Sequence, residues 1–344
     1  MARGGNKRGG ARGGGGGKMN VRQVYVQRLA KIFGVRPAEA ERLASIPLKS
    51  SIRINALSPL SSEEIKQRLD VFGAQLEPIS WCPGAYHLLS DKRALAESEL
   101  FQDGHIYIQN ASSLIPALAM QPQAGERILD VCAAPGGKTA HIQALASEGA
   151  GGGALIVAND AMKPRLKKLE EVLTTFHVAG VTITNFQGQF IDRHVAEMPN
   201  EQGERQFDRI LLDAQCSGEG MQDLSHPGAL RFWSVERVIK MSYLQQKMLT
   251  AAWKVLKPGG VLVYSTCTYG PEENEGPIAR HLKHNVDAKI EPIDFDGAGA
   301  IEGRMPGLKS WGEQRFPIEL AHAIRVRPST FLEGFFVCRL RKTG

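Results

Sequence analysis

Five short apolar runs, separated by segments with helical spacing, occupy the sequence from residue 127 onward. Short apolar runs that alternate with helices are typical of a parallel sheet that helices cover on both faces. In such α/β sheets, ligands bind at the carboxyl ends of the strands. A long helix precedes the last run, and we expect Pro258-Gly259-Gly260 to end it. The predicted strands are Ile128–Val131, Leu155–Asp160, Val181–Thr184, Phe207–Asp213 and Val261–Tyr264.

A different pattern precedes this region. Residues 21–33 and 37–43 have helical spacing, residues 51–55 alternate like a half-buried strand, and Ser61-Ser62-Glu63-Glu64 offers a helix start that Gly73 terminates. An extended stretch follows over residues 79–89. This order predicts a small α+β module of the ferredoxin-like or RNA-recognition type. Because 344 residues exceed the usual size of one core, we assign residues 19–106 to this module and residues 107–344 to the α/β domain.

Almost all of the net charge of +6 comes from residues 2–18, which hold five basic residues and no acidic one. This segment repeats Arg-Gly-Gly and has almost no apolar surface to bury, so we expect residues 1–18 to be disordered. Arginine and glycine segments can follow a nucleic-acid backbone through charge, but such a tail can equally be a solubilising extension.

Several classes of protein are disfavoured. No apolar stretch reaches the roughly 18 residues that a membrane span needs, and the first residues do not resemble a signal peptide, so we expect a cytoplasmic protein without a membrane segment. The five cysteines show neither a disulfide framework nor metal-ligand spacing. We therefore expect no metal site and free thiols.

The turn after the first predicted strand reads Asp-Val-Cys-Ala-Ala-Pro-Gly-Gly-Lys-Thr over residues 130–139 and leads into a helix. Its small residues let a ligand approach the backbone, and the helix start offers unpaired N–H groups, so a nucleotide is the expected ligand. The turn resembles the end of a phosphate-binding P-loop, but Cys132 stands where that motif needs glycine. Asp160, which ends the second strand, is placed to accept both ribose hydroxyls, and Arg165 can close over such a ligand unless it belongs to a solvated helix face.

Two cysteines each follow an apolar run. Cys216 lies three residues after Asp213, and Cys267 follows the last predicted strand. If the two strands are neighbours, both thiols and the carboxylate share one pocket, which suits covalent chemistry on an electrophilic ring. The alternative is that the cysteines are small buried hydrophobic residues at strand ends.

The chain resembles the RNA cytosine-C5 methyltransferases of the RsmB/NOP2/Sun-domain family. The resemblance covers about residues 50–342 and rests on DVCAAPGGKT, LLDAQCSG and YSTCT in this order, with YIQNASS and EGFF in support. It implies a class I methyltransferase domain that binds S-adenosylmethionine, preceded by a small RNA-binding module. The implied product is 5-methylcytosine in structured RNA, with ribosomal RNA slightly favoured over transfer RNA.

The resemblance also implies roles for individual residues. Asp160 would hold the ribose, with Arg165 as its partner. Gln187 falls where the family usually has an acid near the adenine, and Gln215 stands where it commonly has proline, so we expect a less constrained loop before Cys216. The remaining implied cofactor contacts are Cys132, Ala133, Ala134, Pro135, Gly136, Gly137, Lys138 and Asp213.

The implied mechanism uses a thiolate because the C5 carbon of cytosine becomes nucleophilic only after addition at C6. By resemblance, Cys267 is the nucleophile, Asp213 contacts the base and Cys216 assists release. Two alternatives stay open at this point: an RNA-binding or ribosome-assembly factor with an idle methyltransferase site, and a P-loop-like nucleotide hydrolase.

Overall fold

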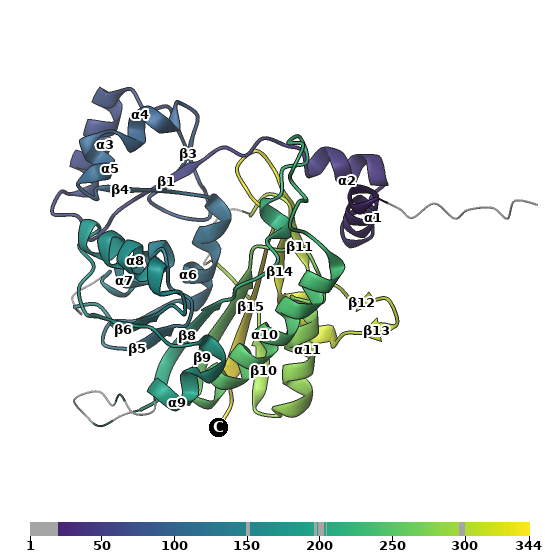
Figure 1. Cartoon of the computed structure of the whole chain (residues 1–344). Helices are drawn as coiled ribbons and strands as arrows, with labels where there is room; N and C mark the ends of the chain where they lie inside the picture. Colours follow the sequence, from purple (N-terminus) through teal and green to yellow (C-terminus); the bar gives the residue numbers. More distant parts are fainter. Residues whose placement is uncertain (1–19, 149–151, 196–197, 199–202, 204, 296–299) are drawn as a thin grey trace, which may run out of the picture.

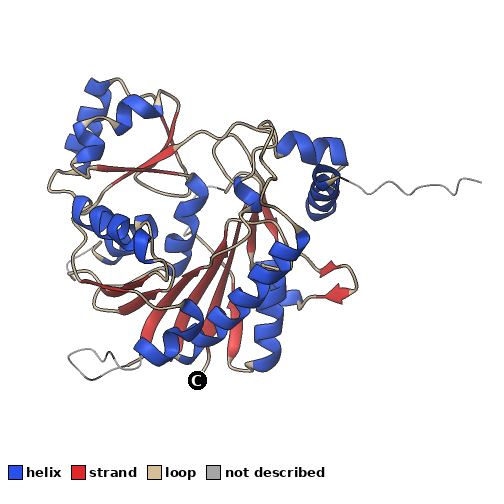
Figure 2. Ribbon diagram, in the orientation of Figure 1, coloured by secondary structure: helices blue, strands red, loops and turns tan. Residues whose placement is uncertain are grey.

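The structure is a computed structural model that describes residues 20–148, 152–195, 198, 203, 205–295 and 300–344. A small sheet and a large sheet dominate these residues, and helices pack around both (Figures 1 and 2). The tail predicted to be disordered lies outside the described residues. Within the described ranges, none of the helices combines the length and the apolar character that a membrane crossing requires.

The small sheet has the antiparallel strand order β2-β3-β1-β4. Ser61 and Glu64 form a reciprocal capping box at the start of α3, and Gly73 ends this helix with φ of 78°, as the sequence predicted. Connectivity and order together are ferredoxin-like, which confirms the predicted class. The elements are β1 (Ser51–Ile54), α3 (Ser62–Phe72), β2 (Leu76–Pro78), β3 (Ala85–Leu88), α4 (Lys92–Ala96), α5 (Glu99–Gln102) and β4 (Ile106–Gln109).

Two boundaries differ from the predictions. The stretch predicted as extended over residues 79–89 contains a turn, and only Ala85–Leu88 forms a strand there, with a second strand earlier at Leu76–Pro78. The small sheet includes β4 and so reaches Gln109, past the predicted boundary at residue 106. Both differences arise from strand pairing, which local alternation does not specify.

Helices α1 (Val21–Phe33) and α2 (Pro37–Leu43) have the predicted bounds, but they lie apart from the small sheet (Figure 1). They pack against the large domain. The Tyr25 ring meets Trp233 edge-on at 5.0 Å, and Phe33 meets Tyr269 at 5.1 Å. The Arg28 guanidinium also forms a two-pronged ion pair with Glu272. The first helix is therefore attached to loops of the α/β domain.

The large sheet contains nine strands among the described residues, in the order β11-β14-β15-β9-β8-β5-β6-β7, with β10 paired to β15. The five predicted strands form its parallel part: β5 (Arg127–Asp130), β6 (Leu155–Asn159), β7 (Val181–Thr184), β8 (Phe207–Asp213) and β9 (Leu256–Thr266). The others are antiparallel and were not predicted: β10 (Ala288–Glu291), β11 (Arg304–Pro306), β14 (Ile324–Val326) and β15 (Phe335–Lys342).

Successive residues along β8 point to opposite faces of the sheet and pack in different hydrophobic cores. Leu211 belongs to the core beneath α6 (Ile115–Met120) and α7 (Gly137–Ala146), whereas Ile210 and Leu212 belong to the core beneath α10 (Val235–Lys254) and α11 (Glu275–His284). The prediction that Pro258-Gly259-Gly260 ends the long helix is wrong, because α10 stops at Lys254 and these residues lie within β9. The remaining helices are α6 (Ile115–Met120), α7 (Gly137–Ala146), α8 (Lys163–Thr175), α9 (Ile191–Val195), α10 (Val235–Lys254) and α11 (Glu275–His284).

Short 3-10 turns and one hairpin complete the described secondary structure. They are η1 (Ala111–Leu114), η2 (Gly188–Phe190), η3 (Glu219–Met221), η4 (Ile318–His322), β12 (Ser310–Trp311) and β13 (Gln314–Arg315).

Candidate active site

The two cysteines meet at the carboxyl ends of neighbouring strands. Strands β8 and β9 pair in parallel, with Asp213 opposite Ser265. This register brings the loops that follow them together, so that the sulfur atoms of Cys216 and Cys267 lie 3.2 Å apart. Both cysteines are free thiols. The structure thus shows the convergence that the sequence predicted on the condition that the two strands are neighbours.

Asp213 is held on both carboxylate oxygens. Ser265 Oγ donates a hydrogen bond to Oδ1 at 2.7 Å, and Lys138 Nζ lies 2.9 Å from Oδ2. Burial alone would lower the pKa of Lys138, but the charge of Asp213 and their hydrogen bond outweigh it, so the pKa is raised above its usual value. Lys138 therefore remains an ammonium group beside Asp213 and the thiols.

The two thiols are not equivalent. The hydrogen bond to Cys267 and, next, burial raise the pKa of Cys216 well above its usual value. Cys216 therefore remains a protonated thiol in hydrogen-bond contact with Cys267.

The loop that carries Cys216 is anchored although Gln215 replaces proline. Gln245, on the inner face of α10, donates from Nε2 to the carbonyl oxygen of Gln215 and to Glu273 Oε2, both at 2.8 Å. The backbone N–H of Ser217 donates to the same Glu273 oxygen at 2.9 Å. We expected Gln215 to leave this loop less constrained, and the structure shows hydrogen bonds that hold it on both sides of Cys216.

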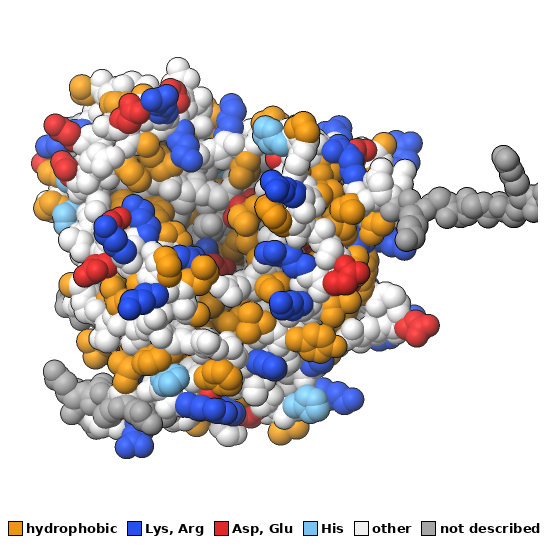
Figure 3. Space-filling model, in the orientation of Figure 1, with side chains coloured by type: hydrophobic (Ala, Val, Ile, Leu, Met, Phe, Trp, Pro, Cys, Tyr) orange, Lys and Arg blue, Asp and Glu red, His pale blue; other side chains and the backbone are white. Residues whose placement is uncertain are grey.

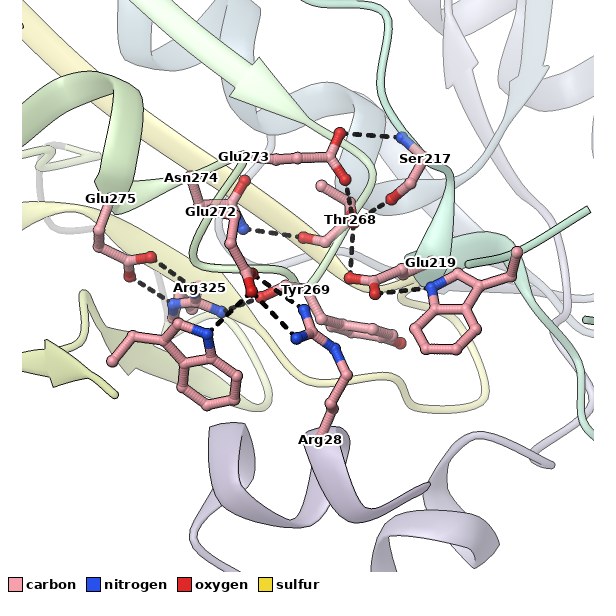
Figure 4. A network of polar contacts seen from close by, with 12 residues as sticks. Arg28, Ser217, Glu219, Thr268, Tyr269, Glu272, Glu273, Asn274, Glu275 and Arg325 are labelled. Carbon is pink, nitrogen blue, oxygen red and sulfur yellow. Dashed lines mark hydrogen bonds and ion pairs between the residues drawn. The ribbon is translucent and has the colours of Figure 1, made fainter. Parts of the chain in front are cut away.

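A polar network ties the loops after β8 and β9 together, as Figure 4 shows. Thr268 Oγ1 donates to Glu219 Oε2 at 2.8 Å and lies 2.9 Å from Ser217 Oγ. The indole N–H of Trp233 donates to the other oxygen of Glu219 at 2.8 Å. Two buried carboxylates, Glu219 and Glu273, thereby fix the mutual position of the segments that bear the thiols.

Glycines allow three backbone segments, at Gly220, Cys267 and Gly334, to come into direct hydrogen-bond contact. Gly220 N donates to the Cys267 carbonyl at 3.0 Å, and Gly334 N donates to the Gly220 carbonyl at 3.3 Å. A Cβ on Gly334 would lie 1.9 Å from the Tyr269 ring, and one on Gly220 would lie 2.0 Å from the Gly334 carbonyl oxygen. No side chain fits at either position.

A cavity of about 260 Å³ ends at Asp213 and lies over the turn between β5 and α7. It contains most of the cofactor contacts that the resemblance implied, together with residues from β4 and η1, within the YIQNASS segment, to which no cofactor contact was assigned. The lining residues are Tyr107, Ile108, Gln109, Ser113, Asp130, Cys132, Ala133, Ala134, Pro135, Gly137, Lys138 and Asp213.

Asp160 and Arg165 flank this turn. The Ala134 N–H donates to Asp160 Oδ2 at 3.3 Å, and the Met162 N–H donates to Oδ1 at 2.9 Å. Arg165 Nη1 lies 3.0 Å from Asp160 Oδ2, and its Nη2 donates to the Ala134 carbonyl. Arg165 thus has a specific contact at the turn and is more than a solvated helix residue.

Asp130 has an unused acceptor. Thr139 Oγ1 donates to Oδ2 at 2.7 Å, while the buried Oδ1 has no hydrogen-bond partner among the described residues. Burial raises the pKa of Asp130 to about 7. An unpaired buried acceptor that lines the cavity fits a donor such as an amino group, and the Asp160 carboxylate fits a ribose. The residues present therefore fit S-adenosylmethionine.

Gln187 is not brought into this cavity. It is exposed, and its Oε1 accepts a hydrogen bond from Gln189 Nε2 at 2.8 Å. Conversely, sequence reasoning missed Glu333, which lies near Lys138 and Asp213. Burial raises the pKa of Glu333 to about 7, Asp213 adds to the increase and Lys138 opposes it. Nothing in the local sequence around EGFF marks this glutamate as part of a charged cluster. Among the described residues, no group of three His, Cys, Asp or Glu side chains is arranged to hold a metal ion.

Comparisons with known proteins agree with this geometry. A family model described as 16S rRNA methyltransferase RsmB/F matches residues 117–341, and one described as the N-terminal domain of 16S rRNA methyltransferase RsmF matches residues 22–111. A crystal structure of a methyltransferase homologue from Pyrococcus horikoshii has a TM-score of 0.72 at 28% identity, and covers 94% of this chain and 100% of that chain.

Two curated relatives carry specific names. Ribosomal RNA small subunit methyltransferase F of Pectobacterium atrosepticum is 38% identical over 307 residues, which cover 87% of this chain and 57% of that protein. The tRNA (cytosine(49)-C(5))-methyltransferase of Pyrococcus abyssi is 36% identical over 299 residues, which cover 86% of this chain and 89% of that protein. The chain spans little more than half the length of the first relative.

The P-loop alternative does not survive these findings, because both relatives are methyltransferases and Lys138 is paired with Asp213. The chain belongs to the family described as 16S rRNA methyltransferase RsmB/F, whose members take their methyl group from S-adenosylmethionine.

Proposed function

We propose that the chain methylates the C5 carbon of cytosine in RNA through a covalent adduct with Cys267. The observation that carries this proposal is the arrangement of Cys267, with Cys216 3.2 Å away, beside the Lys138–Asp213 pair and next to the cofactor cavity. The names of the two relatives support RNA as the substrate and, for one of them, cytosine C5 as the methylated position.

The residues divide the chemistry among them. Cys267 adds to C6 of the cytosine, and the electron pair of the C5–C6 double bond moves toward N3 and the 4-amino group. Asp213 contacts this edge of the ring, and the Lys138 ammonium passes a proton through Asp213 to N3, which neutralises the charge that develops there. Because Ser265 and Lys138 fix Asp213 from two sides, little reorganisation is needed as the carbon–sulfur bond forms.

S-adenosylmethionine, when bound, supplies an electrophilic methyl group to C5. Water then takes the C5 proton, the electron pair of that C–H bond restores the C5–C6 double bond, and the bond between C6 and Cys267 breaks. The N3 proton returns through Asp213 to Lys138. The departing sulfur takes up negative charge, and the Cys216 thiol is placed to donate a hydrogen bond to it. The target base has to leave its stack to reach this site.

The test measures transfer of labelled methyl from S-adenosylmethionine to RNA isolated from cells that lack the protein. Bisulfite sequencing then locates the new 5-methylcytosine and decides between ribosomal and transfer RNA. We expect the native chain to label cytosine C5 and Cys267→Ala to be inactive while retaining cofactor binding. If the native chain crosslinks to RNA without any methyl transfer, it is a binding or assembly factor with an idle site and the proposal is wrong.

A further inference from the structure

Helix α10 presents a basic stripe to solvent. Lys240, Lys247 and Lys254 recur every seven residues, with Tyr243 and Thr250 between them, so all five share one face of the helix. The fourteen residue-to-residue steps from Lys240 to Lys254, at a rise of about 1.5 Å each, extend this stripe over ~21 Å. Figure 3 shows Lys and Arg side chains along the line that α10 takes in Figure 1, with hydrophobic side chains between them.

The stripe forms one wall of a groove. The opposite wall comes from η2 and α9, which supply Phe190 and Arg193, and the groove encloses about 600 Å³. Gly188 allows this close approach, because a Cβ there would lie 2.9 Å from the Met248 sulfur of α10. The groove is therefore built from two elements and is more than a single helix face.

The charge of the groove is largely uncompensated. Asp192 pairs with Lys254 at 2.9 Å, which neutralises one cation. No ion pair joins Lys240, Lys247 or Arg193 to a residue within the described ranges. The only carboxylate on α10 itself is Glu236, near the start of the helix. A polyanion is the matching ligand.

Exposed aromatic rings in the groove indicate which kind of polyanion it is suited to bind. The Tyr243 side chain is 66% exposed and Phe190 is 40% exposed, both at the groove. The Arg193 guanidinium lies 5.0 Å from the centre of the Phe190 ring, which extends the flat surface. Cations that follow a backbone, combined with exposed rings on which bases stack, are the physical pattern of single-strand nucleic-acid binding.

The groove also connects to the thiols through α10. Gln245, on the inner face of the helix, holds the loop of Cys216, while Tyr243 and Lys247 lie on the outer face. We propose that this groove binds the single-stranded RNA segment that flanks the target cytosine. This inference rests on the proposed function only in taking RNA as the substrate.

The experiment measures binding of the full chain to a fluorescent single-stranded RNA oligonucleotide by anisotropy, without methyl donor and at several salt concentrations. The triple variant Arg193→Gln/Lys240→Gln/Lys247→Gln is expected to weaken binding at least about tenfold at 0.1 M salt. Its log–log salt dependence should flatten by about 2, since each lost cation releases roughly 0.7 counterions fewer on a single strand. Tyr243→Ala should weaken binding about tenfold with an unchanged salt slope.

The control is Lys283→Gln/Lys289→Gln, which removes two exposed lysines from α11 and β10, one charge fewer than the triple variant. Native affinity and salt slope in the triple variant would overturn the inference, as would an equal loss in the control. A variant that changes the oligomeric state while RNA affinity stays native would instead identify the groove as a self-association surface. Methyl transfer by the native chain is scored separately, so failure of the proposed function and failure of this inference are distinguishable.

Discussion

The sulfur of Cys216 lies 3.2 Å from the sulfur of Cys267, which is hydrogen-bond contact and far longer than the ~2.05 Å of a disulfide. The pKa of Cys216 is raised well above its usual value, so this residue remains a protonated thiol beside Cys267. The separate roles proposed for the two thiols can be tested.

Replacement of Cys216 by Ala should trap the enzyme on its RNA. Without the Cys216 thiol, the departing sulfur of Cys267 loses its hydrogen-bond donor. The covalent protein–RNA adduct should therefore accumulate and appear as a band of reduced mobility on a denaturing gel. The double variant Cys216→Ala/Cys267→Ala should give no band, and neither should Cys338→Ala, which alters a buried packing cysteine. Trapping by Cys267→Ala instead would reverse the two roles.

Removal of the cation beside Asp213 should slow the chemical step strongly. We expect Lys138→Met to reduce the single-turnover rate about 10²- to 10⁴-fold, the range of positioned proton transfer. Ser265→Ala deletes only one neutral hydrogen bond to the same carboxylate and should cost about tenfold. Rapid-quench measurement of methyl transfer gives both rates. Equal losses of rate in Lys138→Met and Ser265→Ala would show that the chemical step needs Asp213 to be oriented but does not need the charge of Lys138.

Arg165 should contribute to cofactor affinity through its contacts with Asp160 and the Ala134 carbonyl. We expect Arg165→Gln to weaken binding of S-adenosylmethionine about tenfold by calorimetry, because Asp160 loses its partner at the turn. The control Lys168→Gln removes an exposed charge from the same helix, α8. If both variants bind alike, Arg165 is a solvated helix residue.

Glu333 should make stability dependent on pH. The folded pKa of this buried acid is raised to about 7, so it stabilises the fold below its unfolded pKa near 4.5 and loses that contribution as pH rises to 7. We expect Glu333→Gln to flatten the dependence of the free energy of unfolding on pH between the unfolded and the folded pKa. At pH 8 the substitution should raise the free energy of unfolding by on the order of 1–2 kcal/mol. Urea titrations at several pH values measure this effect. Glu313→Gln, an exposed change, should leave the curve as it is.

The contact between Tyr269 and Gly334 should not tolerate a methyl group. We expect Gly334→Ala to lower the free energy of unfolding by about 3 kcal/mol or more, because a Cβ would overlap the ring at 1.9 Å. Gly228→Ala is the matched control, since a Cβ at Gly228 meets nothing within 4 Å and should change stability by less than about 0.5 kcal/mol. Thermal and urea unfolding of the two variants decide this prediction.

Local signals predicted much of the fold. The capping box of Ser61 and Glu64, the glycine after α3 and the apolar runs each act over a few residues, so they can be read directly from the sequence. The antiparallel strand β14 was missed because it is short and its apolar character is interrupted by Arg325, whose guanidinium pairs with Glu275, far away in the chain.

The candidate site likewise contains residues that local sequence identifies and others that distant contacts bring in. Asp213 ends β8, and Cys216 and Cys267 follow β8 and β9, so their convergence could be predicted from the sequence. Glu333, in contrast, joins their cluster through the pairing of β15 with β9. The attachment of α1 likewise depends on a distant contact, in which the Tyr25 hydroxyl donates to the Glu219 carbonyl at 2.8 Å. Gln187 was placed by resemblance, and the orientation of its exposed side chain is not encoded in the motif.

The backbone contact between Gly220 and Gly334 bears on how a base can enter and leave the site. Main chain fills the space where Gly220 and Gly334 meet next to the Cys267 carbonyl, and no side chain fits there. Under the proposed mechanism, a base bonded to Cys267 would therefore leave by the opening through which it arrived, and a second RNA would have to wait until the first has gone.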